Sequence, residues 1–173
     1  MSADPLDGRM GEAWAGEAPN GAHVNVVVAR RGSPTAAAIV GALASPRPGH
    51  LPFLACVRLG DLVRPATVIV NKATLEGQTL PKLTWGAAQL GVAQGILDAV
   101  ADSVIDAGEA AELVLLVPVW VDAAASDETA LRLANRAATL AAIENALRPP
   151  TADDVRALAA RRDGAWNAFY SGE

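Results

Sequence analysis

The stretch that most constrains the fold is residues 22–29, Ala-His-Val-Asn-Val-Val-Val-Ala. Its apolar and β-branched residues show no helical period, which is typical of a strand covered on at least one face. Side chains alternate along a strand, so the valines at positions 24, 26 and 28 share one face, while His23 and Asn25 share the other. The stretch therefore predicts a strand with a core face and an opposite face that carries an imidazole and an amide.

Strand and helix patterns alternate along the rest of the chain. Strands are predicted at 11–17, 51–59, 64–74 and 113–121, with a turn at 18–21 and a hairpin through Gly60 and Asp61. Helices are predicted at 35–44, after Pro81, after the Ser126-Asp127 cap and after a capping box from Thr151 to Asp154. This order predicts the α/β (α+β) class, as a two-layer sandwich with helices on one face of a mixed sheet.

Apolar spacing indicates which face each helix buries. For the helix after Pro81, the predicted stripe is Leu90, Ala93, Leu97, Val100 and Val104. For the following helix, the predicted stripe is Leu133, Leu140, Ile143 and Leu147. In the last helix, Val155 and Leu158 are expected to face inward.

Length and pattern predict a single domain over residues 11–150, in a chain of 173 residues. Residues 1–10 are expected to be a flexible N-terminus. Residues 151–173 are expected to form a C-terminal helix and an aromatic tail with Trp166, Phe169 and Tyr170. Aromatic side chains in such a tail favour docking on the body or on a neighbouring subunit.

Charge and composition exclude several classes of function. A net charge of −5 without a basic cluster argues against nucleic-acid binding. The longest apolar run, residues 113–121, is far shorter than the ~20 residues of a membrane span, and no secretory signal is evident. The single Cys56 fits a cytoplasmic setting, and two histidines without ligand spacing predict no metal site.

Five short blocks occur in order: Gly-Glu-Ala at 11–13, Ala-His at 22–23, Arg-Gly-Ser-Pro at 31–34, Asn-Lys-Ala-Thr at 71–74 and Gly-Ala-Ala-Gln at 86–89. In these blocks the chain resembles the formaldehyde-activating enzyme family over roughly residues 10–148. The resemblance implies a cytoplasmic homopentamer with a fold like the second domain of ribosomal protein S5. It also implies a role in one-carbon metabolism, in which formaldehyde condenses with tetrahydromethanopterin to give the methylene derivative and water.

The resemblance also implies residue roles. The family's general acid matches His23, and its pterin contacts match Asn25, Leu54, Lys72, Thr74 and Gln89. Asn25 stands where the family has aspartate, which keeps the size of the side chain but removes its negative charge. Ala87 likewise replaces the proline of the family's Gly-Pro-Ala-Gln block. Both changes are typical of a diverged paralogue.

The chemistry of the reaction suits a histidine. Joining an aldehyde to two nitrogens passes through a carbinolamine, and loss of its hydroxyl as water requires a proton. An imidazole with an ordinary pKa of ~6.5 gives and takes protons near neutral pH. His23 is therefore the candidate acid, with Lys72 and Thr74 as positioning groups.

Other interpretations of the same residues stay open. A strand histidine is often structural, Lys72 can be a solvated strand-end charge, and Thr74 and Gln89 can bond to backbone. A catalytically weak paralogue that binds a reduced pterin or formaldehyde, as a sensor or buffer, is a second hypothesis. A structural or partner-binding oligomer is a third.

Overall fold

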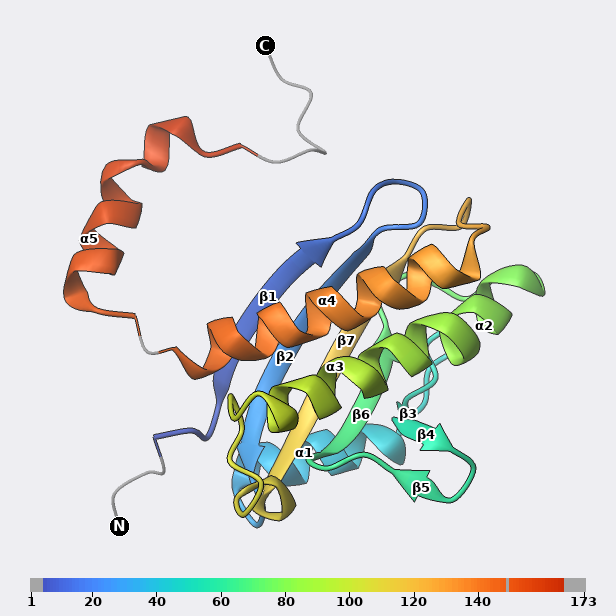
Figure 1. Cartoon of the computed structure of the whole chain (residues 1–173), viewed down its shortest axis with the longest axis horizontal. Helices are drawn as coiled ribbons and strands as arrows, with labels where there is room; N and C mark the ends of the chain where they lie inside the picture. The colour runs from blue at the N-terminus through green and yellow to red at the C-terminus, as the bar shows by residue number, and fades with distance from the viewer. Residues whose placement is uncertain (1–4, 149, 167–173) are drawn as a thin grey trace.

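The computed structural model describes residues 5–148 and 150–166. Its main sheet has five strands, in the spatial order β1-β2-β7-β6-β3. Their bounds are Arg9–Ala15 (β1), Ala22–Arg30 (β2), Phe53–Leu54 (β3), Ala66–Asn71 (β6) and Leu113–Val121 (β7). β6 and β7 are parallel and the other neighbours are antiparallel. The predicted mixed sheet is confirmed (Figure 1).

Two long helices, α3 (Gln89–Ala101) and α4 (Glu128–Leu147), lie side by side across one face of this sheet (Figure 1). A short helix α2 (Thr79–Leu83) continues through a π-helical turn (Thr84–Ala88) into α3, and a 3-10 turn (Ala110–Glu112) precedes β7. The two-layer α/β arrangement is thus confirmed.

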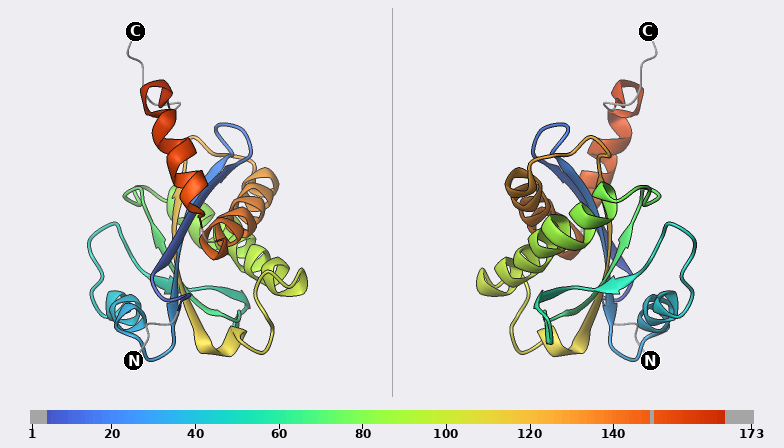
Figure 2. Two further views of the ribbon diagram at one scale, coloured as in Figure 1. Left: turned by 90° about the vertical axis from the view of Figure 1, so that its left-hand side faces the viewer. Right: turned by 90° about the vertical axis from the view of Figure 1, so that its right-hand side faces the viewer.

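The opposite face of the sheet is covered at one end by α1 (Pro34–Leu43) (Figure 2). Ser33 caps this helix by accepting a hydrogen bond from the Ala36 amide at 3.0 Å. Ala36 and Ile39 pack on Ala29 of β2 and Val68 of β6. Since α1 covers one end only, the rest of this face is left open.

The valine face of β2 forms the centre of the core, as predicted. The three valines at 24, 26 and 28 are buried together with Val117 of β7 and with Val92, Ile96 and Ile143 of the helix layer. His23 and Asn25 project from the opposite, open face of the same strand. Register therefore separates the core from the candidate site.

The buried faces of α3 and α4 follow the predicted stripes only in part. Ala93 and Ile143 are buried as predicted, and four more predicted residues pack against the core: Val100, Val104, Leu140 and Leu147. Leu97 is 42% exposed, and the core side chains of α3 are Val92, Ala93, Ile96 and Ala99. The cause is a seam of two glycines, Gly91 and Gly95, which face α4 closely. Leu133 is likewise exposed, and α4 buries mainly alanines, at positions 134, 138, 142 and 146. Small residues set the orientation because they let the helix backbones approach.

The predicted strand at 51–59 is broken at Ala55. The Ala55 amide donates to the Thr67 carbonyl of β6, while the Ala55 carbonyl accepts from the Val63 amide. The chain therefore leaves the main sheet, and β4 (Cys56–Arg58) pairs with β5 (Asp61–Leu62) in a small separate sheet. The hairpin predicted through Gly60 and Asp61 is confirmed, and the long strand is corrected to these shorter pieces.

The capping box at Thr151 is confirmed, since Thr151 and Asp154 exchange both bonds ahead of α5 (Ala152–Ala160). The prediction that Val155 and Leu158 face inward is wrong, because they are 57% and 66% exposed. A 3-10 turn (Arg162–Gly164) follows α5.

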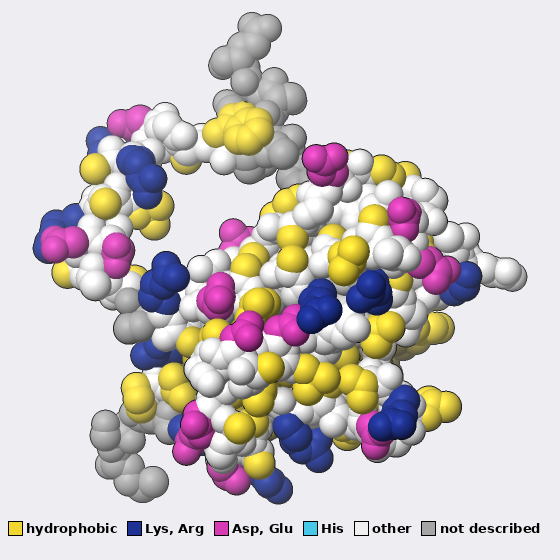
Figure 3. Space-filling view, viewed as in Figure 1, with side chains coloured by type: hydrophobic (Ala, Val, Ile, Leu, Met, Phe, Trp, Pro, Cys, Tyr) yellow, Lys and Arg dark blue, Asp and Glu magenta, His cyan; other side chains and the backbone are white. Residues whose placement is uncertain are grey.

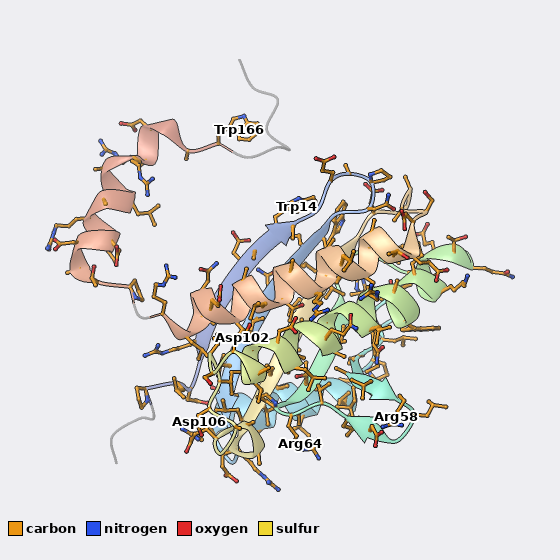
Figure 4. The ribbon with its side chains drawn as sticks, in the orientation of Figure 1. Trp14, Arg58, Arg64, Asp102, Asp106 and Trp166 are labelled. Atoms are coloured by element: carbon orange, nitrogen blue, oxygen red, sulfur yellow. The ribbon has the colours of Figure 1, made fainter. Side chains whose placement is uncertain are left out.

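α5 extends away from the sheet, and Trp166 beyond it is 73% exposed (Figures 1 and 4). Phe169 and Tyr170, predicted to dock with Trp166, lie outside the described residues. Local capping specifies that a helix forms here, but it does not specify a surface on which the helix packs.

Charged side chains of both signs lie across the helix layer (Figure 3). Arg136 of α4 donates two hydrogen bonds to the Asp98 carboxylate of α3, at 2.5 and 2.7 Å, and these bonds lower the pKa of Asp98. Within the described ranges, no helix combines the length and the apolarity needed to cross a membrane.

We expect Gly95→Ala to destabilise the fold by about 1–3 kcal/mol through overpacking. A methyl group at Gly95 would meet the Arg136 carbonyl oxygen at 2.5 Å and the Thr139 Cβ at 2.8 Å. The matched control is Gly41→Ala in α1, where the new methyl group meets open space and raises helix propensity. Urea unfolding at equal protein concentration measures both. Equal stability of the two variants would contradict the glycine seam.

Candidate active site

The candidate site lies on the open face of the sheet, where strand pairing aligns polar and aromatic side chains. In the antiparallel register, His23 of β2 stands between Trp14 of β1 and Trp120 of β7. Two residues further along β2, Asn25 pairs with Glu12 of β1. Because alternate residues share a face, these five side chains project to the same side.

The His23 ring is held by both of its nitrogens. Its Nε2 forms a short hydrogen bond with the Glu12 carboxylate, and its Nδ1 lies 3.1 Å from Lys72 Nζ. A carboxylate only accepts and an ammonium only donates, so this arrangement selects the tautomer with the proton on Nε2. Glu12 and Lys72 therefore fix the orientation of the imidazole, whose side chain is about one-third exposed.

Lys72 follows β6 and reaches back across β7 to β2. Its backbone amide donates to the Val119 carbonyl at 2.7 Å, which fixes the start of the side chain. Its Nζ donates to Asn25 Oδ1 at 2.6 Å. Partial burial lowers the pKa of Lys72 to about 8, and the nearby Glu12 charge only partly opposes this effect. A larger fraction of Lys72 is therefore neutral near pH 7 than for an ordinary lysine.

Two tryptophans form an aromatic surface beside the imidazole. The rings of Trp14 and Trp120 lie 5.5 Å apart between centroids, and Trp14 lies 6.1 Å from the His23 ring. Trp14 is 46% exposed near the end of β1 (Figure 4), where its Nε1 donates to the Gly16 carbonyl at 3.1 Å. Exposed aromatic faces of this kind suit a planar ring ligand.

Thr74 lies at the edge of this surface. It lines a pocket of about 440 Å³ together with Trp120 and with residues that precede and begin α2. Its hydroxyl lies 3.3 Å from Nε2 of His50, whose Nδ1 is 3.0 Å from the Asn71 carbonyl. The pocket is therefore continuous with the Trp120 end of the site.

Leu54 and Gln89 lie apart from the His23 group. Leu54, on the edge strand β3, pairs with Val68 and faces the open side. Gln89 begins α3, in the helix layer on the other face, and its Nε2 donates to the Cys56 carbonyl at 2.7 Å. It lines a second pocket of about 450 Å³, which shares no lining residue with the pocket at Thr74. One chain therefore does not bring Gln89 to His23.

Sequence reasoning missed three members of the site, Glu12, Trp14 and Trp120. The predicted turn at 18–21 held a signal for the first two. A hairpin through that turn places alternate residues of the preceding strand opposite His23 and Asn25. Trp120 depends on β2 pairing with β7, about 90 residues away, which no local pattern specifies.

Metal ligands are not gathered in this site. Over residues 5–148 and 150–166, no three His, Cys, Asp or Glu side chains come together in a way that could hold a metal ion. The groups that the site offers are instead an imidazole, an amine, an amide and aromatic rings, which suit proton transfer and the binding of an organic ligand.

Comparison with known proteins shows the family of the chain. A family model described as "Formaldehyde-activating enzyme (Fae)" matches residues 10–166. The chain belongs to the formaldehyde-activating enzyme family. The match covers the sheet, both long helices and every residue of the candidate site.

Individual relatives agree with the family assignment. The chain is 34% identical to a 5,6,7,8-tetrahydromethanopterin hydro-lyase of Methanosarcina barkeri, over 95% of this chain and 91% of the relative. It is also 34% identical, over 80% of its length, to a bifunctional enzyme Fae/Hps of Methanothrix thermoacetophila. A bifunctional enzyme Fae/Hps of Archaeoglobus fulgidus is 32% identical over 95% of this chain. The match spans only 35% and 41% of these two bifunctional relatives.

In this member of the formaldehyde-activating enzyme family, we expect Asn25→Asp to raise the pKa of Lys72 above about 8, because a carboxylate would then contact the ammonium. Glu12→Gln should lower it further, since the Glu12 charge now raises it. The chain has two lysines, so NMR titration of ¹⁵N-labelled lysine side chains gives two assignable signals. Lys82, paired with Glu128, is the internal reference. Unchanged Lys72 titration in both variants would refute this electrostatic account.

Proposed function

We propose that the chain condenses formaldehyde with tetrahydromethanopterin to give methylene-tetrahydromethanopterin and water. One observation carries the proposal: in a member of this family, an imidazole is held between a carboxylate and an amine on an open, aromatic-lined face. Residues 11–150 would perform this function as one domain, within one-carbon metabolism in the cytoplasm.

In this proposal His23 is the general acid. It delivers the proton with which the hydroxyl of the carbinolamine leaves as water, and it takes a proton back before the next turnover. Glu12 keeps the ring oriented through Nε2, so Nδ1 remains directed toward Lys72 and the open face. Proton transfer of this kind contributes about 10²–10⁴-fold to a rate.

The pterin would bind across the aromatic surface. Trp14 and Trp120 offer ring faces, while Thr74 marks a pocket large enough for part of a ring system. Asn25 can donate to or accept from a heterocycle, although its oxygen now holds Lys72. Holding both substrates beside His23 adds a proximity effect, which can exceed that of acid catalysis.

A homopentamer is the assembly that we propose. Gln89 lies on the opposite face from His23, so both can reach one pterin only if different subunits supply them. The open face also exposes Met10, Trp14 and Leu54, which a neighbouring subunit would bury. Light scattering of the purified protein measures the state, and a monomer would count against it.

The second candidate is a catalytically weak paralogue that binds formaldehyde or a reduced pterin. Asn25 favours it, because loss of the family carboxylate leaves Lys72 bonded to a neutral amide. Measurable binding by the native chain, together with a rate that is gained only in Asn25→Asp, would favour this candidate over the enzyme.

We expect His23→Ala to reduce the enzymatic acceleration by about 10²–10⁴-fold, because it removes the acid. The assay follows methylene product from formaldehyde and tetrahydromethanopterin, with the uncatalysed rate subtracted. Circular dichroism and the melting temperature check that the fold is kept. An undiminished rate in the folded variant would refute the role of His23.

A shared site predicts complementation between two defective variants. Co-assembled His23→Ala and Gln89→Ala chains should regain activity, because about a quarter of interfaces in a 1:1 mixture join two intact halves. The matched control is His23→Ala with Lys72→Ala. Both substitutions lie on the same face, so no interface of that mixture carries an intact open face. Equal activity of the two mixtures would contradict a site made by two subunits.

A further inference from the structure

We propose that Lys72 captures formaldehyde covalently, as a carbinolamine and then an iminium on Nζ, before the carbon passes to the pterin. The inference deepens the proposed function, from which it takes the identity of the aldehyde. It assigns to Lys72 a bond-forming role in place of a positioning role.

The surroundings of Lys72 are those of a reactive amine. The side chain is half-buried on the open face, with Nζ between His23 Nδ1 at 3.1 Å and Asn25 Oδ1 at 2.6 Å. In the described part of the chain, no carboxylate forms an ion pair with it, because the Glu12 carboxylate is bonded to His23 instead. Desolvation and a neutral partner both favour the uncharged amine, as in lysines that form Schiff bases.

The chemical steps balance with groups that are present. The lone pair of neutral Nζ attacks the carbonyl carbon, a C–N bond forms, and a proton moves to the oxygen to give the carbinolamine. His23 then protonates the hydroxyl, the C–O bond breaks, and water leaves the iminium. A nitrogen of the pterin attacks the iminium carbon and loses a proton, which gives an aminal. Protonation of Nζ then lets the C–Nζ bond break, so that the free lysine leaves and the carbon becomes an iminium on the pterin. The second pterin nitrogen attacks this carbon and releases its proton, which closes the methylene bridge.

His23 is placed to serve this chemistry. Its Nδ1 lies within hydrogen-bond distance of the attacking nitrogen, so it can pass the proton that Nζ releases to the carbonyl oxygen. Once protonated again from solvent, it can deliver a second proton to the departing hydroxyl. The same imidazole thus serves capture at Lys72 and the later loss of water.

The charge state of Lys72 supports capture near neutral pH. With its pKa lowered to about 8, roughly a tenth of the amine is neutral at pH 7, about 300 times the fraction for an ordinary lysine. A less basic amine is a weaker nucleophile, so the expected gain in reactivity is smaller, about tenfold or more.

The chain supplies its own reference amine. Lys82, the other lysine, is exposed and lies 2.8 Å from Glu128, which raises its pKa. A general reaction of formaldehyde with surface amines would not favour Lys72 over Lys82, because Lys82 is the more accessible. Faster reaction of formaldehyde at Lys72 than at Lys82 would therefore be an effect of the surroundings of Lys72.

The test is reductive trapping of the full-length protein with formaldehyde and sodium cyanoborohydride at pH 7, without pterin. Peptide mass spectrometry over time then locates the added methyl groups, and the N-terminal amine falls in a separate peptide. We expect Lys72 to be methylated about tenfold or more faster than Lys82. Equal rates, or faster labelling of Lys82, would overturn the proposal.

A variant at a neighbouring residue tests the mechanism without removing the amine. Asn25→Asp places a carboxylate against Nζ, so labelling of Lys72 should fall toward the rate of Lys82, which itself should not change. Lys82→Arg, in α2 and paired with Glu128 at the start of α4, should leave Lys72 labelling intact. Persistent fast labelling of Lys72 in Asn25→Asp would contradict the role of the neutral amide.

Failure of capture and failure of the proposed function are distinguishable. Selective labelling of Lys72 without acceleration of the pterin reaction would support capture and refute the enzyme. Acceleration by a protein whose Lys72 is not preferentially labelled would support the enzyme and overturn covalent capture.

Discussion

The pairing of β2 with β1 and β7 is the constraint on which the rest of the structure depends. It buries one side of β2 beneath α3 and α4, and by the same register it gathers Glu12, Trp14 and Trp120 around His23 on the other side. A shift of one residue would exchange the two faces. Stability of the core and assembly of the site are therefore specified by a single alignment of strands.

Electrostatics around Lys72 follow from one residue of that alignment. Asn25 has the size of aspartate, so it keeps the hydrogen bond to Nζ, yet it supplies no charge to offset the burial of the ammonium. The Glu12 charge compensates only in part, and the Glu12 carboxylate is bonded to His23. The amide thus favours the neutral form of Lys72 while preserving the geometry, so the contact that positions Nζ also makes it more reactive.

How much could be predicted from sequence differs between elements. Alternation in residues 22–29 predicted both faces of β2 because the period of a strand is short and its valines are unambiguous. Apolar spacing predicts most of the buried helix residues, but it misplaces Leu97 and Leu133, because Gly91 and Gly95 determine how closely α3 meets α4. The prediction of one long strand over 51–59 is wrong at Ala55. There the chain changes its pairing partner, and hydropathy carries no signal for such a change. The prediction that α5 turns Val155 and Leu158 inward is wrong, because the apolar spacing of a helix indicates which face is apolar but not what that face packs against.

The candidate site shows the same limit at a larger scale. His23, Asn25 and Lys72, predicted from separate blocks, meet within hydrogen-bond distance, although Lys72 is 49 residues from His23 in sequence. Gln89, predicted for the same ligand, begins a helix on the reverse of the sheet and is bonded to Cys56. Side-chain rotation cannot bring Gln89 to His23, because the sheet and its buried valines lie between them. If all these residues serve one pterin, the missing half of each site comes from another copy of the chain, and assembly becomes a condition of the chemistry rather than an addition to it.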